Sequence, residues 1–277
     1  MATKKQLEYE NDLLQWRAER YNSLVRENGW LALAGLFWLN EGRNLVGSNP
    51  MCEVILPERA PTFLGVAHMQ GKTVRFTVAE GVRLKVNGRL AQKAILKSSK
   101  EAKPSFITWN DNLRLVVHEH AGKPAIRIWD NLREERFSLP PLKWFPINKD
   151  LRIAARYKRY PDARQAEHVD TFGEMVDDRL DGYVTFSYMG NKYKLDVTET
   201  SSHALYIKFR DETSNKETYP PSRYYYTKPV GPDGKVILDF NYSYSPPCAF
   251  TPYATCIFAP PQNKLPFRVE AGEIYRG

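Results

Sequence analysis

The sequence predicts a mainly β protein with an N-terminal helix, a first β sandwich, and a second antiparallel β sandwich or barrel that carries a proline-rich ordered lid. Three observations predict this class. Helical spacing of apolar residues occurs at the start of the chain. Beyond it, strand-length runs follow one another at intervals of about ten residues, which is typical of sandwiches and barrels. Asn-Gly and other Gly-containing turns separate many of these runs.

The first element is an amphipathic helix over residues 5–28. Apolar side chains recur there at spacings of three, four and seven: these are Leu7, Leu14, Tyr21 and Val25, with Leu13, Trp16 and Leu24 beside them. Gly29 is the expected stop, because glycine commonly follows the last turn of a helix. We assign residues 1–36 to an N-terminal helical segment.

A first β sandwich is predicted over residues 37–135. The strongest hairpin signal is Asn87-Gly88 inside "VRLKVNGRLAQKAIL", because Asn-Gly suits a two-residue turn between alternating runs. Further turns are expected at Asn40–Gly42, Asn110–Asn112 and Ala121–Lys123.

A second antiparallel β unit is predicted over residues 136–277. Residues 131–150 are broken by prolines and mixed in charge, so we place the boundary within them. Strand-like runs follow, with turns at Met189–Asn191 and in "VGPDGK". Proline fixes one backbone angle of the second turn, and glycine supplies a positive one.

The net charge of +8 is concentrated in residues 51–100, which carry nine Lys or Arg and three Asp or Glu. These basic residues alternate with Val, Phe and Leu, as on the wet face of a sheet. We therefore expect solvated strands and regard nucleic acid as an improbable partner. The alternative is a non-catalytic interaction module that uses this basic sheet through Lys85, Arg89 and Lys93.

The chain contains no run of about 20 apolar residues that could span a membrane. An acidic, helix-patterned segment stands where a signal peptide would be apolar. We expect a cytoplasmic protein with no membrane partner. Its three cysteines, Cys52, Cys248 and Cys256, are few and odd in number, which favours reduced thiols.

Motifs for nucleotide, zinc or serine-hydrolase chemistry are absent, so we expect no cofactor. "HEH" places His118 and His120 on one strand face, and we interpret them as exposed sheet histidines. A metal site of Cys248 and Cys256 with His203 or His118 is a minority hypothesis, and no metal is expected. The acidic residues Asp177, Asp178 and Asp181 are interpreted as a strand-connecting turn.

The densest set of candidate site residues lies in the second unit. Asp239 and Asn241 point to one face of a strand end, where Arg223 from a neighbouring strand could join them. Such a group binds an anionic or hydroxylated ligand, because arginine makes bidentate contacts that a carboxylate orients. The alternative is a buried structural network that ties down the irregular segment that follows.

If the site is catalytic, we expect a hydrolytic or acid-base reaction without a cofactor. An aspartate is the base and Arg223 holds the anion, so the catalytic candidates are Asp211, Arg223 and Asp239. If it is not catalytic, we expect a protein that binds a small polar or anionic molecule. The residues do not decide between these alternatives, nor do they indicate an oligomeric state.

At these residues the chain resembles the domain of unknown function 1684 family, through "GWLALAGLFWLNEGRNLVGSNP", "GYVTFSYMGNKYKLD", "FRDETSNKETY" and "LDFNYSYSPPCAFTPYATCIFAPPQNKLP". The resemblance covers nearly the whole chain. It implies a shared role for the matching residues, which are Asp211, Tyr219, Arg223, Asp239, Asn241, Cys248, Cys256, Asn263 and Glu273. From this set we take Tyr219, Asn241, Cys248, Asn263 and Glu273 as ligand-binding candidates.

The first β unit also resembles a forkhead-associated sandwich. At the phosphopeptide-reading positions, however, it has Gly47-Ser48 and Ala60-Pro61. The arginine that would grip a phosphothreonine is missing, so we expect the scaffold without phosphopeptide binding.

The lid is the segment from Leu238 to Glu273. Its six prolines limit the conformations of the unfolded chain, so ordering the segment costs less entropy. We expect a rigid lid or seal over a site or a core, with Cys248 and Cys256 as small buried apolar groups.

Overall fold

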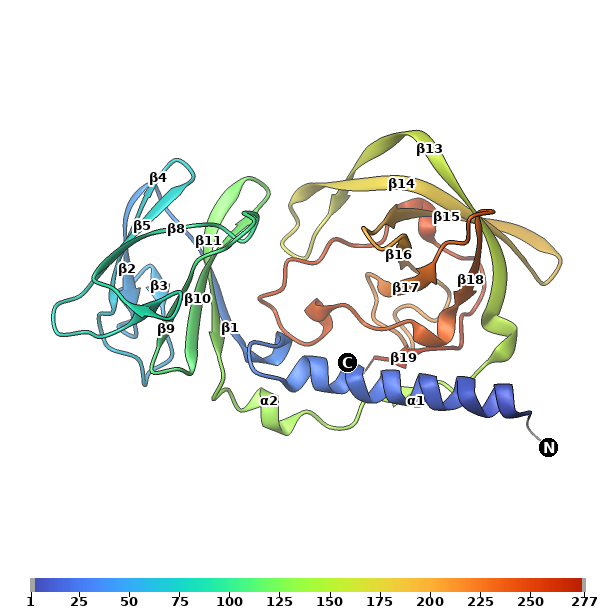
Figure 1. Cartoon of the computed structure of the whole chain (residues 1–277), viewed down its shortest axis with the longest axis horizontal. Helices are drawn as coiled ribbons and strands as arrows, with labels where there is room; N and C mark the ends of the chain where they lie inside the picture. The colour runs from blue at the N-terminus through green and yellow to red at the C-terminus, as the bar shows by residue number, and fades with distance from the viewer. Residues whose placement is uncertain (1–2, 276–277) are drawn as a thin grey trace. The chain divides into compact units, whose positions relative to one another are not determined.

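The computed structural model describes residues 3–275. The chain divides into two compact units. The N-terminal β unit comprises residues 22–139, and the C-terminal unit comprises the residues up to Tyr21 together with those from Pro140 onward. Figure 1 shows both units and labels their elements.

The predicted helix is present as α1 (Lys4–Val25). A 3₁₀ turn, η1 (Trp30–Ala32), follows it. Gly29 lies four residues beyond the helix, and a Cβ there would lie 2.7 Å from the carbonyl oxygen of Arg26, so this position requires a small residue. The helix itself ends at Val25, three residues before the predicted limit.

The N-terminal β unit is a sandwich of two sheets, as predicted. One sheet has the order β1 (Leu33–Trp38), β11 (Lys123–Asp130), β10 (Leu113–His120), β9 (Phe106–Trp109), β6 (Lys85–Val86) and β7 (Arg89–Leu90). The other has the order β3 (Val54–Ile55), β2 (Gly42–Gly47), β4 (Gly65–Gln70), β5 (Thr73–Val78) and β8 (Lys93–Leu96). Buried apolar side chains from both sheets form one core, among them Val46, Phe76, Leu115 and Ile126. A short helix, α2 (Glu135–Ser138), ends the unit.

The turn chemistry of this unit follows the sequence. Asn87 and Gly88 both have positive φ, 50° and 79°, as a two-residue hairpin turn requires. The turn expected at Asn40–Gly42 does not join a hairpin, however, because β1 pairs with β11 whereas β2 pairs with β3 and β4. The side chain of Asn44 accepts the Asn40 N–H at 2.8 Å and so holds the chain as it crosses between sheets.

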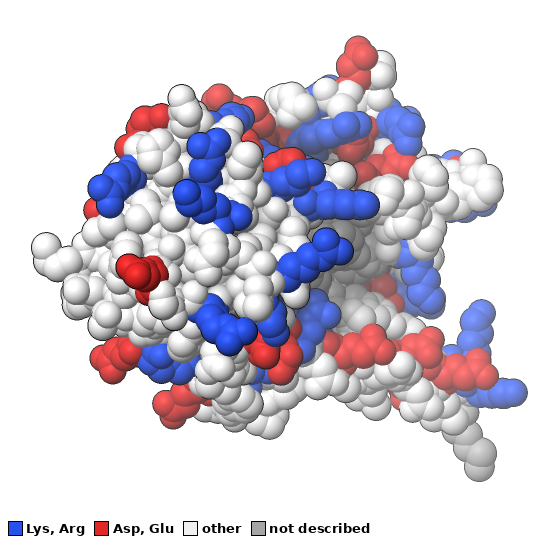
Figure 2. Space-filling view, turned by 60° about the vertical axis from the view of Figure 1, so that its left-hand side comes forward, with Lys and Arg blue, Asp and Glu red and all other residues white. Residues whose placement is uncertain are grey.

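Within residues 51–100 the basic residues are exposed, apart from the half-buried Lys85. On β5 Arg75 is exposed while Val74 and Phe76 are buried, which confirms the predicted alternation. Figure 2 shows Lys and Arg scattered over a mostly uncharged surface. Of the three residues proposed for partner capture, Arg89 and Lys93 are exposed and Lys85 pairs with Asp111 at 3.0 Å.

The C-terminal unit contains a curved antiparallel sheet that nearly closes into a barrel. Its order is β17 (Arg223–Pro229), β16 (Ala204–Phe209), β15 (Asn191–Glu199), β14 (Met175–Tyr188), β13 (Arg152–Val169) and β18 (Lys235–Asp239). In Figure 1, β13 and β14 curve around the other strands. The core inside it includes Val184, Leu195, Ile207 and Phe240. A small second sheet pairs β12 (Lys143–Trp144), which precedes the 3₁₀ turn η2 (Lys149–Leu151), with β19 (Glu273–Ile274).

The acidic residues Asp177, Asp178 and Asp181 lie within strand β14, so the expectation of a connecting turn is wrong. Strands β13 and β14 form a hairpin that continues past a bulge between Arg159 and Arg164. The extra length buries Asp178, which accepts from His168 at 2.9 Å and pairs with Lys208. Burial lowers the pKa of Lys208, and Asp178 opposes that effect.

The proline-rich segment is ordered through the 3₁₀ turns η3 (Phe240–Tyr242), η4 (Pro247–Ala249) and η5 (Pro261–Asn263). Side chains hold its backbone where regular ladders are missing. The Thr171 hydroxyl donates to the Ala254 carbonyl at 2.6 Å, and the Tyr224 hydroxyl donates to the Ile257 carbonyl at 2.7 Å. The segment therefore lies against β17 and the β13–β14 hairpin. Among the described residues, no helix has the length and apolarity needed to cross a membrane.

Candidate functional site

The structure brings Arg223 and Asp211 together but places them in the interior. Their side chains are 1% and 0% exposed, and an Arg223 N–H meets the carboxylate at 3.0 Å. Arg223 also donates to the carbonyls of Val269 and Ala271, while Asp211 accepts the Val269 N–H. The pair thus fixes the irregular chain near residue 270, as the structural alternative anticipated.

Asp239 and Asn241 form a different group. Asp239 caps η3, accepting from the backbone and the side-chain amide of Asn241 at 3.2 and 2.9 Å. Asn241 exchanges hydrogen bonds with both backbone groups of Asn148, at 2.9 and 2.8 Å. The other partners of Asp239 are Tyr9 and Arg152, at 3.1 and 3.3 Å. The carboxylate of Asp239 therefore lies beside helix α1, with partners other than Arg223.

Asn263 and Glu273 are buried, and their side chains link segments that are distant in sequence. The Asn263 side chain accepts the Asp196 N–H and donates to the carbonyls of Asp196 and Lys208, each at 2.8 Å. Glu273 is 1% exposed and pairs with Arg20 of α1 at 3.3 Å. Burial raises the pKa of Glu273, although Arg20 opposes this shift.

Tyr219 contacts Cys248 of the lid. The Tyr219 hydroxyl donates to the Cys248 carbonyl at 3.2 Å. The Cys248 N–H donates to the Cys256 sulfur at 3.3 Å, and both thiols are free. A hydrogen bond with Cys256, reinforced by burial, raises the pKa of the Cys248 thiol.

No group of three or more His, Cys, Asp or Glu side chains within residues 3–275 is arranged to hold a metal ion. His203 instead bonds Glu199 at 2.7 Å. His118 and His120 stack at 6.0 Å and are only partly exposed, which corrects the expectation of exposed histidines. Burial and the neighbouring Arg127 lower the pKa of His118 to about 3.

A hollow of about 650 Å³ lies where the barrel fails to close, between β17 and β18, and we call it the seam pocket. Its wall combines five aromatic residues with seven charged ones, among them Glu8 and Asp12 of α1. Tyr9 and Trp16 come from α1, Tyr226 comes from β17, and Tyr242 comes from η3. Tyr226 is 48% exposed, which is unusual for a ring of that size on a barrel strand.

The Tyr225 hydroxyl replaces the missing backbone ladder across this seam. It accepts the Asp239 N–H at 2.8 Å and donates to the Ile237 carbonyl at 3.2 Å. Among the described residues no backbone ladder joins β17 to β18, because the register pairs β17 with β16 and β18 with β13. The edges therefore stay apart, and the space between them becomes the pocket.

The polar end of the seam pocket is an ion pair. Asp239 is nearly buried and Arg152 is 50% exposed, so the guanidinium faces the open space with the carboxylate behind it. Arg152 also lies over the ring of Tyr9, 5.2 Å from its centre. Burial first, and then Asp239, raise the pKa of Tyr9, which stays protonated as a donor.

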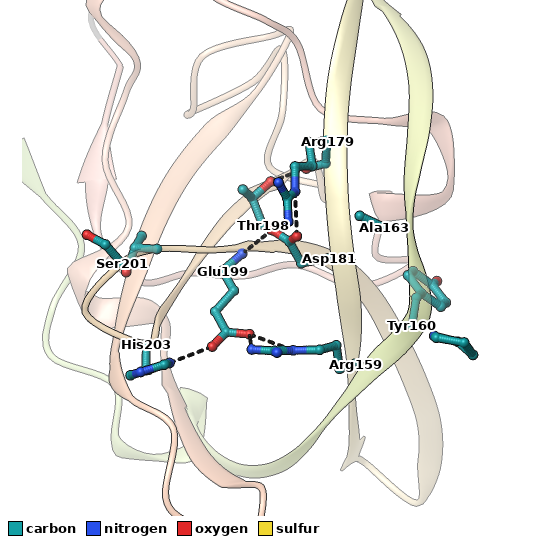
Figure 3. A pocket seen from close by; sticks show the side chains of 11 residues that line it. Arg159, Tyr160, Ala163, Arg179, Asp181, Thr198, Glu199, Ser201 and His203 are labelled. Atoms are coloured by element: carbon teal, nitrogen blue, oxygen red, sulfur yellow. Dashed lines mark hydrogen bonds and ion pairs between the residues drawn. The ribbon is translucent and has the colours of Figure 1, made fainter. Parts of the chain in front are cut away.

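A second hollow of about 450 Å³ lies elsewhere in the same unit and shares no lining residue with the first. We call it the Glu199 pocket, and Figure 3 shows its side chains. Glu199, 9% exposed, is centred between Arg159 of β13 and His203 of the turn that follows β15. Arg179 and Asp181, from β14, form a second ion pair at 2.6 Å on its wall.

Glu199 is held as an anion. Burial alone would raise its pKa, but hydrogen bonds from His203, Arg159 and Tyr157 outweigh burial and lower the pKa to about 2. Burial and the hydrogen bond to Glu199 raise the pKa of Tyr157 to about 12. Glu199 is therefore a carboxylate at neutral pH, and the Tyr157 hydroxyl keeps its proton.

Sequence reasoning missed the wall of the seam pocket and the centre of the Glu199 pocket. The clearest available signal was "ETSSH", in which Glu199 and His203 flank a short polar turn. Arg159 is 40 residues away from Glu199 in sequence, and nothing local connects them. Of the predicted catalytic and ligand-binding residues, Asp239 lines the seam pocket; Asp181 and His203, which the sequence suggested as a turn residue and as a minority metal ligand, line the Glu199 pocket.

Comparisons with known proteins give one family. The family model described as "Protein of unknown function (DUF1684)" matches residues 138–274, so the predicted resemblance holds for the second half of the chain and was drawn too widely over the first. Among solved structures, the solution NMR structure of an uncharacterized protein from Haloarcula marismortui is similar, with 27% identity and a TM-score of 0.42. That match covers 51% of this chain and 80% of the other. No curated protein matches the chain.

Proposed function

We propose that this chain, whose residues 138–274 belong to the family of proteins of unknown function (DUF1684), binds a small molecule in the seam pocket of its C-terminal unit. The observation that carries the proposal is the pocket itself. A hollow of about 650 Å³ between two unpaired strand edges has the size of a small-molecule site.

The lining defines the class of ligand. Tyr9, Trp16, Tyr226 and Tyr242 offer ring faces and edges to a flat apolar body. Arg152 supplies an anion partner at one end, and Asp239 fixes the orientation of its guanidinium at 3.3 Å. The ligand is therefore a small molecule with a planar apolar part and an anionic group.

Asp239 retains a role in this proposal, as the residue that orients Arg152. Asn241 supports Asp239 from behind. We assign Asp211, Arg223, Asn263 and Glu273 to the scaffold, because their side chains lie in the interior and bond to backbone, to one another or, for Glu273, to Arg20. Cys248 belongs to the lid, and Tyr219 lies outside it and donates to the Cys248 carbonyl.

The test uses 1-anilinonaphthalene-8-sulfonate, which combines planar rings with an anion. The full chain should show saturable fluorescence enhancement. Arg152→Ala and Tyr226→Ala should each weaken the affinity by roughly tenfold, equivalent to about 1.4 kcal/mol. Arg156→Ala is the matched control, since Arg156 is exposed on the same strand but lies outside the seam pocket.

Equal affinity in all four proteins would place the dye elsewhere and refute the proposal. Each variant's thermal midpoint is measured alongside, so that lost binding is separated from lost folding. Quenching of Trp16 fluorescence on titration should follow the same binding curve, because Trp16 lines the pocket.

A further inference from the structure

We propose that the Glu199 pocket is a second, catalytic site, in which His203 activates water to hydrolyse small carboxylic esters. It is independent of the seam pocket, with which it shares no residue. The inference rests on three features of geometry: an oriented imidazole, a rigid turn that holds it, and guanidinium groups facing the same hollow.

The imidazole is oriented by the carboxylate behind it. The Nδ1 atom of His203 lies 2.7 Å from a Glu199 oxygen. Because the Glu199 carboxylate can only accept, Nδ1 is the donor, and in the neutral tautomer that the proposal uses Nε2 presents its lone pair. The His203 side chain is 71% exposed, so Nε2 is open to water in the pocket.

The turn that carries His203 is stiff. His203 has φ of 60°, a conformation that costs energy for a residue other than glycine. The surrounding hydrogen bonds hold it there. The His203 N–H donates to the Thr200 carbonyl at 2.9 Å, and its carbonyl accepts the Val230 N–H at 2.9 Å. The imidazole is therefore positioned by the backbone as well as by Glu199.

The same hollow contains groups for the charge that develops on the substrate. Arg159 and Arg179 are each 65% exposed and line the pocket with His203. Their inner N–H groups bind Glu199 and Asp181, and the exposed part of each guanidinium faces solvent. The paired carboxylates cancel the arginine charges, so the pocket admits a neutral ester while retaining donors for an oxyanion.

The proposed reaction balances without a cofactor. Nε2 of His203 takes a proton from water as the water oxygen bonds to the carbonyl carbon, and the carbonyl π electrons move to its oxygen near a guanidinium. The bond to the leaving oxygen then breaks with its electron pair, and the proton on Nε2 passes to that oxygen. Ester and water become acid and alcohol, and His203 is neutral again.

Charged and titratable groups around His203 and Glu199 come from three strands. They are Glu199 on β15, Arg159 and Tyr157 on β13, and Arg179 and Asp181 on β14. Glu199 is a positioning residue in this scheme, because it acts through His203. Replacing Glu199 should therefore lower kcat while changing KM little. If Glu199 had only a structural role, its replacement would alter neither constant.

The test measures hydrolysis of p-nitrophenyl acetate by the full chain and by His203→Asn. Asparagine tolerates the left-handed backbone conformation of this position but has no proton acceptor of comparable basicity, so the fold is retained and the chemistry is lost. We expect kcat/KM to fall by about 10²-fold, the low end of general-base contributions. Free imidazole added to the variant should restore part of the rate.

The matched control is His68→Asn, which removes an exposed histidine of the N-terminal β unit. Exposed imidazoles hydrolyse activated esters unspecifically, so this variant measures the background. Equal rates for His203→Asn, His68→Asn and the unaltered protein would overturn the proposal. An unchanged kcat in Glu199→Gln would also overturn the role of the pair, and neither result bears on dye binding in the seam pocket.

Discussion

Two arginine–carboxylate pairs in the C-terminal unit have opposite surroundings. Arg223 and Asp211 are 1% and 0% exposed, and the other hydrogen-bond partners of the pair are backbone groups and the hydroxyls of Thr213 and Ser214. Arg159 and Glu199 are 65% and 9% exposed and line a hollow. The residue types are the same in both pairs. Burial makes the first pair part of the scaffold, and exposure leaves the second free to meet a ligand.

The comparison explains why a charged cluster in a sequence is a poor guide to chemistry. A buried pair must satisfy its charge inside the protein, because leaving either ion unpaired costs several kcal/mol. Arg223 therefore uses its donors on Asp211 and the chain near residue 270. Arg159 keeps donors in water at little cost, so those donors are available for other tasks.

The largest effect on stability is expected when the buried pair of Arg223 and Asp211 is broken. Arg223→Met should lower the free energy of unfolding by about 3–5 kcal/mol, because Asp211 and two backbone carbonyls lose their buried partner. Chemical denaturation measures the loss. Arg159→Met is the matched control and should shift the midpoint little. If both variants were equally stable, burial would not distinguish the two pairs.

A smaller effect is expected at the seam. Tyr225→Phe removes the hydroxyl that bridges Asp239 and Ile237, so two backbone groups lose their partner and the free energy of unfolding should fall by about 1–2 kcal/mol. Tyr226→Phe, one residue further along β17, should leave stability unchanged. Urea denaturation of both variants is sufficient, and identical curves would contradict the bridging role.

The smallest effect on the free energy of unfolding is expected for the exposed pair of Arg159 and Glu199, and it depends on pH. The pKa of Glu199 is lowered from 4.5 to about 2 in the folded protein. Its contribution is therefore complete above pH 4.5 and disappears as pH falls through 2. We expect the stability difference between the unaltered protein and Glu199→Gln to shrink over that interval. A difference that stays constant with pH would show that the three donors do not stabilise the carboxylate.

Much of the fold could be predicted from local pattern. The helix, the turn at Asn87-Gly88 and the alternation along β5 follow from residue spacing and from which residues accept positive φ. The turn at Met189-Gly190 has φ values of 48° and 78° for the same reason. Local patterns succeed here because the physical cause acts within a few residues.

The errors in prediction have a common cause. Asp178 looked like a turn residue, but the β13–β14 hairpin extends past it and buries it against Lys208, 30 residues away. Asp239 and Arg223 were expected to meet, yet the seam separates β18 from β17. In each case, the partner of the residue is decided by strands that are distant in sequence.

The sequence by itself determined the β class, the turns, the ordered proline-rich segment and the family of the second half. Only the tertiary structure decided which carboxylates are buried in the interior and which line a pocket. The physical reason is that the exposure of a side chain depends on how several strands pack, whereas secondary-structure propensity depends on neighbours along the chain. Glu199 becomes a candidate because Arg159 and Tyr157, from another strand, surround it and leave one side open.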